Sequence, residues 1–196
     1  MTRVFFCFIW VLCAFSLTAC QDAPVYQGVS EMAVPLQIPP HVDPAAGQNP
    51  TGQSPDSVDY IVVQKKDRIL SVWKQGHIVK TYTIMAMGAD PVGPKVHEGD
   101  ERTPEGIYFI NDKHPSQHFQ KFLKISYPNE DDKKLAKQRG LPVGGDVGIH
   151  GDRGGLSGFW QRFDRTWTDG CIAMRNADIE DIYNRVAVGT PIVIKP

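Results

Sequence analysis

Two side chains in this sequence have the types and the surroundings that covalent catalysis on a carbonyl group requires. Cys171 directly follows Asp169-Gly170, a pair typical of turns, and begins a short apolar run that ends at Met174. His150 is the last residue of a strand-like run. A thiolate attacks carbonyl carbon, and a histidine within hydrogen-bond reach can take the thiol proton and later return it to a leaving amine. We therefore predict that Cys171 is the nucleophile and that His150 is its general acid and base.

The backbone around the cysteine supplies a further part of that chemistry. A strand that ends at His150, a loop and a return at Cys171 would place the two side chains together. The backbone N–H groups there would then face a tetrahedral oxyanion, and the predicted donors are Gly170, Cys171 and Ile172. The alternatives are that Cys171 is a small buried hydrophobe and that His150 is a hydrogen-bonded bystander. We interpret the other histidines as bystanders: His41, His77, His97, His114 and His118.

The first residues of the chain have the pattern of an export signal. Met1-Thr2-Arg3 is short and basic, and the stretch from Val4 to Ala19 is almost wholly apolar but short for a bilayer span. The small residues before Cys20 resemble the lipobox of bacterial lipoproteins, which implies cleavage before Cys20 and a diacylglyceryl group on its sulfur. Ordinary signal cleavage and a buried apolar segment are the alternatives. Gln21, where an aspartate would favour the inner membrane, favours the outer membrane.

The cysteine inventory follows from this prediction. The sequence contains four cysteines. Cys7 and Cys13 would leave with the signal, and lipid would block Cys20. The mature protein would then carry Cys171 as its free thiol, in a compartment where cysteines usually form disulfides. A free thiol in such a place favours a chemical role.

The chain divides into three parts by composition. Residues 1–19 are predicted to be a lipoprotein signal peptide. Residues 20–56 are predicted to be the lipidated cysteine and a disordered, proline-rich tether, because such a segment cannot bury enough apolar surface to fold alone. Residues 57–196 are predicted to be the catalytic domain. The tether would hold this domain at a distance from the membrane.

The domain itself is predicted to be mainly β, with two short peripheral helices. Runs rich in β-branched and aromatic residues predict strands, and the first three predict a meander. These runs are Val58–Gln64, Arg68–Lys74, His77–Met87, Gly106–Ile110, Phe122–Ser126 and Ile192–Ile194. A surface helix is predicted over Glu130–Arg139 with Asn129 as its cap. A second helix is predicted over Ala177–Val186, with Asn176 as its cap and one apolar face on the sheet.

Composition and motifs argue against several classes of function. A net charge of −1 without a basic cluster gives no reason to expect nucleic acid. The sequence has no Cys-x-x-Cys pair and one usable thiol, so we expect no metal. The glycine-rich stretch 144–155 lacks the Gly-Lys-Ser/Thr ending of a phosphate-binding loop. We expect no cofactor.

Several segments together, in this order, resemble the catalytic domain of bacterial L,D-transpeptidases, the YkuD-like cell-wall enzymes. They are Gly93-Pro94-Lys95, Gly99-Asp100, Thr103-Pro104-Glu105-Gly106, Ile125-Ser126-Tyr127-Pro128-Asn129, Ile149-His150-Gly151 and Thr168-Asp169-Gly170-Cys171-Ile172-Ala173-Met174. The resemblance implies a β-sandwich or barrel-like sheet with the cysteine at the end of a cleft. It also implies attack on the peptide bond after a diaminopimelate residue in a peptidoglycan stem. The thioester would then pass to an amine on another stem or on an outer-membrane lipoprotein.

The cysteine motif departs from the commoner family pattern, Ser-His-Gly-Cys-Ile/Val-Arg. Thr168, Asp169 and Ala173 replace its serine, second histidine and arginine. The sequence is closer to the YafK-like branch, in which at least one member is understood to hydrolyse the peptidoglycan–lipoprotein link. Loss of the arginine removes a group that would shape the cleft or hold a substrate carboxylate. The predicted substrate contacts are Gly151, Arg153, Thr168 and Arg175.

Three functions remain open on the sequence. The first is an L,D-transpeptidase, the second is an amidase that uses water as acceptor, and the third is an inactive lipoprotein that binds the cell wall. A thiol-redox function lacks a resolving cysteine. The group that orients His150 is also open: Asp152, Asp169 and a backbone carbonyl are the candidates.

Overall fold

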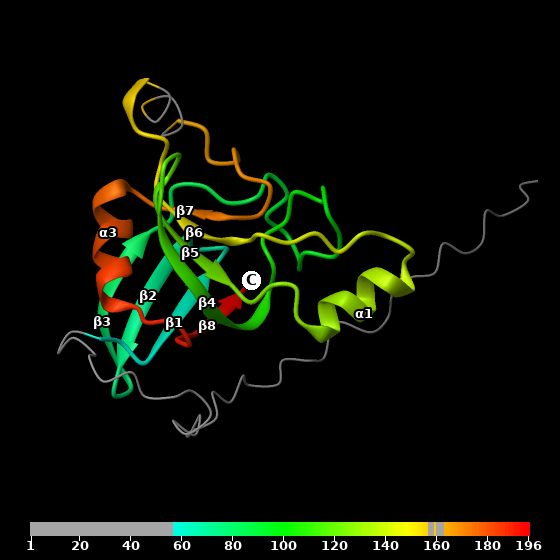
Figure 1. Cartoon of the computed structure of the whole chain (residues 1–196), viewed down its shortest axis with the longest axis horizontal. Helices are drawn as coiled ribbons and strands as arrows, with labels where there is room; N and C mark the ends of the chain where they lie inside the picture. Colours follow the sequence, from blue (N-terminus) through cyan, green and yellow to red (C-terminus); the bar gives the residue numbers. More distant parts are fainter. Residues whose placement is uncertain (1–56, 157–158, 160–162) are drawn as a thin grey trace, which may run out of the picture. The chain divides into compact units, whose positions relative to one another are not determined.

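The computed structural model describes residues 57–156, 159 and 163–196, shown in colour in Figure 1. The predicted signal peptide, the lipidated Cys20 and the proline-rich tether lie outside these ranges. Within the described residues, no helix is long and apolar enough to cross a membrane.

The domain opens with the predicted meander. Strands β1 (Tyr60–Gln64), β2 (Ile69–Lys74) and β3 (His77–Thr83) pair antiparallel in sequence order. Gln75 and Gly76 join β2 to β3 with φ angles of 51° and 76°. Positive φ at both central residues is the requirement of the tight hairpin turn whose twist matches that of the strands.

The remaining strands extend this meander into one eight-stranded sheet in the order β3-β2-β1-β8-β4-β5-β6-β7. They are β4 (Gly106–Ser116), β5 (Gln120–Ile125), β6 (Gly148–His150), β7 (Ile172–Ala173) and β8 (Pro191–Lys195). The first half of β4 pairs with β8, and its second half pairs with β5. Because one long strand serves both neighbours, the sheet curls along it (Figure 1).

Helix α1 (Glu130–Gln138) begins where the sequence predicts. Asn129 caps it: the side chain of Asn129 accepts hydrogen bonds from the N–H groups of Asp131 and Asp132, and the Asp132 carboxylate accepts one from the Asn129 N–H. This reciprocal arrangement satisfies backbone donors that a helix otherwise leaves open. α1 contributes little to the core, since Ala136 is its one buried residue.

The predicted cap of the second helix is wrong. Helix α3 (Asn176–Arg185) already includes Asn176, and the residue before it, Arg175, makes no side-chain capping bond. The Asn176 side chain instead binds Asp152: its Oδ1 accepts from the Asp152 N–H at 3.0 Å, and its Nδ2 donates to the Asp152 carboxylate at 2.7 Å. The residue that local sequence assigns to a cap therefore connects α3 to the segment that follows His150.

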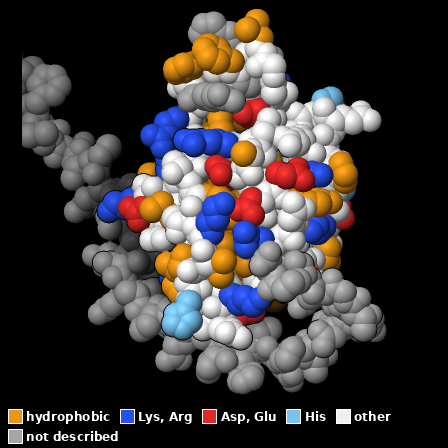
Figure 2. Space-filling model, turned by 90° about the vertical axis from the view of Figure 1, so that its left-hand side faces the viewer, with side chains coloured by type: hydrophobic (Ala, Val, Ile, Leu, Met, Phe, Trp, Pro, Cys, Tyr) orange, Lys and Arg blue, Asp and Glu red, His pale blue; other side chains and the backbone are white. Residues whose placement is uncertain are grey.

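Helix α3 packs its apolar face on the sheet and exposes a charged face. Ile179 and Ile182 are buried. On the outer side, Asp181 forms ion pairs with Lys80 and Arg185, at 2.6 and 2.8 Å. Figure 2 views the molecule from the side on which α3 lies in Figure 1, and there basic and acidic side chains are interspersed.

The hydrophobic core extends beneath the two short strands that carry the site. Ile149 of β6 and Ile172 of β7 are fully buried, as is Met174 directly after β7. Full burial of such a side chain contributes roughly 1.5–3 kcal/mol. Burial of these side chains thus holds β6 and β7 in place, since strands of three and two residues form few backbone hydrogen bonds.

Candidate active site

Parallel pairing of β6 with β7 brings the predicted nucleophile and base into neighbouring segments. Ile149 pairs with Ile172 and His150 with Ala173, so Cys171 lies directly before the paired part of β7. The Met174 N–H donates to the His150 carbonyl at 2.8 Å and fixes this register. The expected return of the chain beside His150 is therefore present.

A backbone carbonyl orients the histidine. Nδ1 of His150 lies 2.7 Å from the carbonyl oxygen of Gly151. Because a carbonyl oxygen can only accept, Nδ1 must carry the hydrogen, which leaves the lone pair of the neutral ring on Nε2. Of the candidate orienting groups, Asp152 is engaged with Asn176 instead. The arrangement supplies an imidazole whose Nε2 can accept a proton.

Gly151 is the residue that makes this contact possible. It is buried, and its N–H donates to the Phe119 carbonyl at 3.0 Å. A Cβ added here would lie 2.3 Å from Asn176 Oδ1 and 2.7 Å from the Phe119 carbonyl oxygen. No side chain fits in this space without displacing the backbone. Gly151, a predicted substrate contact, thus lies beneath His150 and holds it.

Three aromatic rings surround the imidazole. The ring centroid of His150 lies 4.3 Å from that of Phe119, 5.5 Å from that of Trp167 and 5.8 Å from that of Phe122, which is nearly parallel to it. His150 is 2% exposed. Burial among apolar rings disfavours the charged form, and this lowers the pKa of His150 to about 4. The imidazole is therefore neutral at neutral pH.

Cys171 lies in a different environment. The side chain is half-buried, and its thiol donates a long hydrogen bond to the Asp146 carbonyl, at 3.6 Å. Burial raises the pKa of the thiol to about 11; the carboxylates of Asp169 and Asp146 add to the rise, whereas the Gly148 N–H and the Lys95 ammonium oppose it. Both the thiol and the imidazole are therefore neutral at neutral pH, and the segments that carry them are neighbours through the pairing of β6 with β7.

The turn that presents the cysteine is held by its own side chains. The Thr168 hydroxyl donates to the Cys171 carbonyl at 2.7 Å and accepts a weaker bond from the Gly170 N–H at 3.4 Å. Gly170 has a φ of 133°, and a Cβ here would lie 2.4 Å from the Arg102 carbonyl oxygen. Thr168 is buried, so it supports the turn from within. Only glycine fits at 170, because both the backbone conformation and the space exclude a side chain.

The two arginines predicted to contact substrate lie in different surroundings. Arg153 is exposed and stands over the ring of Phe119, with its guanidinium carbon 5.7 Å from the centroid. Arg153, Phe119 and His118 line an open hollow of about 320 Å³. Arg175 is exposed at the start of α3, where its carbonyl accepts the first helical hydrogen bonds. Arg153 is thus the one that adjoins the surroundings of His150.

Several residues that shape the site escape prediction from sequence. The rings of Phe119, Phe122 and Trp167 carry no catalytic signature, and only the fold gathers them around His150. Two histidines interpreted as bystanders join this cluster, since His114 stacks on Phe122 at 5.5 Å and His118 meets the edge of Phe119 at 6.3 Å. A further signal lay in Gly93-Pro94-Lys95 and Gly99-Asp100, which bring an ion pair beneath the cysteine turn.

No group of three His, Cys, Asp or Glu side chains in residues 57–156, 159 and 163–196 is placed to hold a metal ion. His114 and His118 have the i, i+4 spacing that places two ligands together on a helix. Here they lie in and just after β4, and each packs on a different phenylalanine.

The family model described as the L,D-transpeptidase catalytic domain, YkuD, matches residues 58–194. This chain belongs to the L,D-transpeptidase catalytic-domain family. The match includes both short strands and the turn that carries Cys171.

Individual relatives agree with this membership. YafK of Escherichia coli K12, whose designation as an L,D-transpeptidase is itself provisional, is 28% identical over 133 residues, covering 65% of this chain and 46% of YafK. Structures of the helical cell shape determining protein Pgp2 from Campylobacter jejuni superpose with TM-scores of 0.53 (K307A mutant) and 0.51. They are 26% and 25% identical and cover 74% of this chain, with 49% and 52% of Pgp2. The chain spans about half the length of these relatives.

The alanine that stands for the commoner arginine is accommodated by packing. Ala173 is fully buried in β7, and its backbone exchanges hydrogen bonds with Met85 and Ala86. Ala86 is buried as well and bridges to Ala173 antiparallel. Because Ala173 is fully buried, a long charged side chain at this position would need space that the surrounding packing does not leave.

Proposed function

We propose that this chain is a cysteine-dependent peptidoglycan L,D-transpeptidase that acts on diaminopimelate-containing stem peptides through a thioester acyl-enzyme. Cys171 is the nucleophile and His150 the general acid and base. The observation that carries the proposal is the pairing of β6 with β7, which brings an oriented, neutral imidazole beside the turn of the free thiol. Family membership supplies the reaction class.

The reaction proceeds in two halves. Nε2 of His150 takes the proton of Cys171 Sγ as the sulfur attacks the diaminopimelate carbonyl carbon in the peptide bond that follows this residue. The tetrahedral intermediate collapses as the same proton passes to the leaving amine nitrogen, and a thioester remains. An acceptor amine then attacks the thioester carbon and gives its proton to His150, which returns it to the departing sulfur. No proton or electron is gained or lost over the cycle.

The protonation states favour a mechanism without a resting thiolate–imidazolium pair. The pKa of the thiol is about 11 and that of His150 about 4, each displaced by burial. The proton therefore stays on sulfur until a carbonyl is in place. Backbone N–H groups of the Gly170-Cys171-Ile172 segment are the proposed oxyanion donors, and they would make the transfer favourable by stabilising the charge that attack creates. The Gly170 N–H would exchange its weak bond to the Thr168 hydroxyl for the oxyanion.

The hollow beside the histidine is the proposed position of a substrate carboxylate. Its lining combines the Arg153 guanidinium with the Phe119 ring, and His118 completes it. A guanidinium binds a carboxylate through paired, charge-assisted hydrogen bonds. Stem peptides carry such carboxylates on diaminopimelate and at their ends, so Arg153 is the proposed substitute for the arginine that Ala173 replaces.

Lipidation of Cys20 and anchoring in the outer membrane belong to the same proposal. The proline-rich residues 21–56 would let the domain reach the peptidoglycan from that membrane. An amine on a second stem or on an outer-membrane lipoprotein is then the acceptor. Mass measurement of the mature N-terminus tests the anchor: an N-terminus other than a lipidated Cys20 would contradict it.

The decisive experiment follows the acyl-enzyme by mass. The full chain in detergent is incubated with stem-peptide fragments or a carbapenem, digested, and mapped by mass spectrometry. We expect an adduct on the Cys171 peptide that is absent in Cys171→Ala. Cys171→Ser is the second variant, since it keeps the shape of the side chain. An inactive cell-wall-binding protein would form no adduct with any of these compounds, and that outcome would overturn the proposal.

Supplying an acceptor distinguishes transfer from hydrolysis. With an amine-bearing stem peptide present, a transpeptidase yields a new cross-link whose mass joins donor and acceptor. An amidase yields only the freed acid, because water takes the acyl group. The acyl-enzyme is common to both, so this second measurement bears on the acceptor alone.

A further inference from the structure

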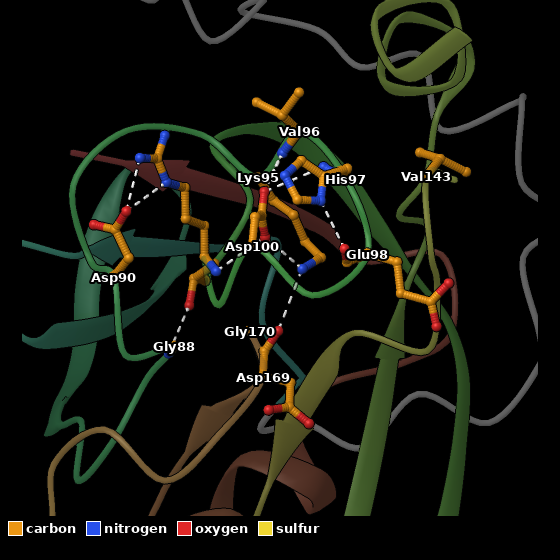
Figure 3. A network of polar contacts seen from close by, with 12 residues as sticks. Gly88, Asp90, Lys95, Val96, His97, Glu98, Asp100, Val143, Asp169 and Gly170 are labelled. Atoms are coloured by element: carbon orange, nitrogen blue, oxygen red, sulfur yellow. Dashed lines mark hydrogen bonds and ion pairs between the residues drawn. The ribbon is translucent and has the colours of Figure 1, made fainter. Parts of the chain in front are cut away.

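A buried lysine lies directly beneath the turn that carries Cys171. Lys95 is 5% exposed, and its ammonium forms an ion pair with the Asp100 carboxylate at 2.7 Å. The same ammonium donates to the Asp169 carbonyl at 3.3 Å, a contact that links two segments far apart in sequence. Figure 3 shows Lys95 reaching from its loop toward Asp169 and Gly170.

The partner carboxylate shapes the loop around the lysine. One oxygen of Asp100 accepts from the N–H groups of Val96 and His97 at 2.6 and 3.1 Å, and the other accepts from the Arg102 N–H at 3.1 Å. Asp100 therefore accepts from four donors, counting the lysine, and links the two ends of the loop from Lys95 to Arg102 (Figure 3). The Arg102 carbonyl of this unit is the group against which Gly170 packs.

Charge in this region acts on the sulfur as well as on the backbone. The carboxylates of Asp169 and Asp146 disfavour a negative charge on Cys171, and the ammonium of Lys95 favours it. The Asp146 carboxylate is itself paired with Lys124 on β5. The ring of His150, on the neighbouring strand β6, is neutral and so adds no charge near the thiol. Among the groups that act most strongly on the thiol within the described residues, the cation is Lys95.

A second buried lysine of the same loop region provides a comparison. Lys65 is 3% exposed, pairs with Glu105 at 2.8 Å and donates to the carbonyls of Gly93 and Thr103. It ties the same long segment to β1, as Lys95 ties it to the cysteine turn. The bonds of the Lys65 ammonium go to this segment and not to the cysteine turn, and Lys65 is not among the groups that act most strongly on the thiol. Its substitution would loosen the segment without changing the charge beside Cys171.

We propose that Lys95 is a positioning residue for Cys171: its ammonium holds the Asp169 carbonyl, and its charge stabilises the thiolate that forms as sulfur loses its proton. By fixing that carbonyl, Lys95 sets the plane of the Asp169–Gly170 peptide and so the direction of the N–H that precedes the nucleophile. Asp100 moderates the charge and keeps the lysine in place. The link to turnover rests on the proposed function, whereas the effect on the thiol does not.

The test measures the reactivity of the thiol without a substrate. The rate of alkylation of Cys171 by iodoacetamide is followed against pH in the full chain, with the modified peptide identified by mass spectrometry. In Lys95→Met we expect the apparent thiol pKa to rise by about one unit, which lowers alkylation at pH 8 about tenfold. In Lys65→Met, the matched control, the profile should stay that of the unchanged protein.

Two further variants separate charge from structure. Asp100→Asn keeps an oxygen for the Val96 and His97 N–H groups but turns its amide NH2 group toward the Lys95 ammonium, so it should release the lysine from its position and lower alkylation at pH 8, as Lys95→Met does. Lys95→Arg keeps the charge and should keep the profile near that of the unchanged protein. These two decide the matter if Lys95→Met does not fold. Equal profiles in all variants, or a change of one sign in Lys65→Met, Lys95→Met and Asp100→Asn that follows their loss of thermal stability, would overturn the proposal.

The outcome is independent of the proposed reaction. Alkylation needs no stem peptide, so Lys95 can be shown to act on the thiol even if Cys171 accepts no acyl group. Conversely, an acyl-enzyme that forms at an unchanged rate in Lys95→Met leaves the transpeptidase in place and removes only the link between Lys95 and turnover.

Discussion

The surroundings of His150 and of Cys171 are built in opposite ways. Around the histidine lie three aromatic rings and one backbone carbonyl, and the ring is almost wholly buried. The cysteine is half-buried on a turn that is held by a hydroxyl, a lysine and neighbouring backbone. A base needs a fixed tautomer and must be unprotonated at rest, and the carbonyl and the apolar cage meet these two requirements. A nucleophile needs stabilisation of the negative charge that develops as it loses its proton, which nearby cations and N–H groups supply.

The largest effect should come from removing the base. In His150→Gln we expect acylation of Cys171 to fall by about 10²–10⁴-fold, the usual contribution of general acid–base catalysis. Alkylation at high pH, where the thiol ionises without help, should stay close to that of the unchanged protein. His77→Gln, on the exposed strand β3, is the control. Acylation that survives in His150→Gln would show that another group takes the proton.

The apolar cage should also make stability depend on pH. His150 titrates at about 4 when folded and near 6.5 when unfolded, so the unfolded chain binds the extra proton between these values. The contribution of the neutral His150 to the free energy of unfolding is intact above pH 6.5. It is lost as pH falls toward 4, by about 3 kcal/mol in total. Urea unfolding at pH 7 and pH 4.5 measures this. His150→Gln should show a smaller loss over the same interval, and an equal loss would contradict a buried neutral histidine.

In the turn that carries Cys171, Gly170→Ala should destabilise the protein through a steric clash and not through a change in polarity. The added Cβ meets the Arg102 carbonyl in a backbone conformation that alanine resists. We expect a loss of about 2 kcal/mol in the free energy of unfolding, together with slower acylation. Gly145→Ala is the matched control, because nothing lies within 4 Å of a Cβ there and φ is ordinary. Similar losses in both variants would argue against a tightly packed turn.

The smallest effect should come from the hydroxyl that supports the turn. Thr168→Val keeps the shape but leaves the buried contact to the Cys171 carbonyl without a donor, and should cost about 1 kcal/mol in the free energy of unfolding. Thr168→Ser keeps the hydroxyl and should lose less. If valine and serine behave alike, the hydrogen bond contributes little. The pKa of His150, followed by NMR, should be unchanged in both, since the Thr168 hydroxyl bonds to the Cys171 carbonyl and the Gly170 N–H and not to the imidazole.

Local sequence was enough for most of the secondary structure. β-branched runs predicted the meander, and Asn129 predicted the start of α1, because strand pattern and capping depend on residues a few positions apart. The strand predicted over Gly106–Ile110 was too short, because β4 continues to Ser116. The added residues are polar and carry no strand pattern, and they become a strand by pairing with β5.

The chemistry of the site divides along the same line. A cysteine after a turn and a histidine at a strand end were visible as residue types, as was the Asp-Gly pair that exposes the thiol. Their approach was not visible, because it depends on the parallel register of two strands separated by a long loop. The aromatic cage, the Gly151 carbonyl on Nδ1 and the Lys95–Asp100 pair have the same origin. The local sequence determined which residues are of a reactive type and which lie on a turn. Packing between segments far apart in the sequence determined their protonation and the groups that face them.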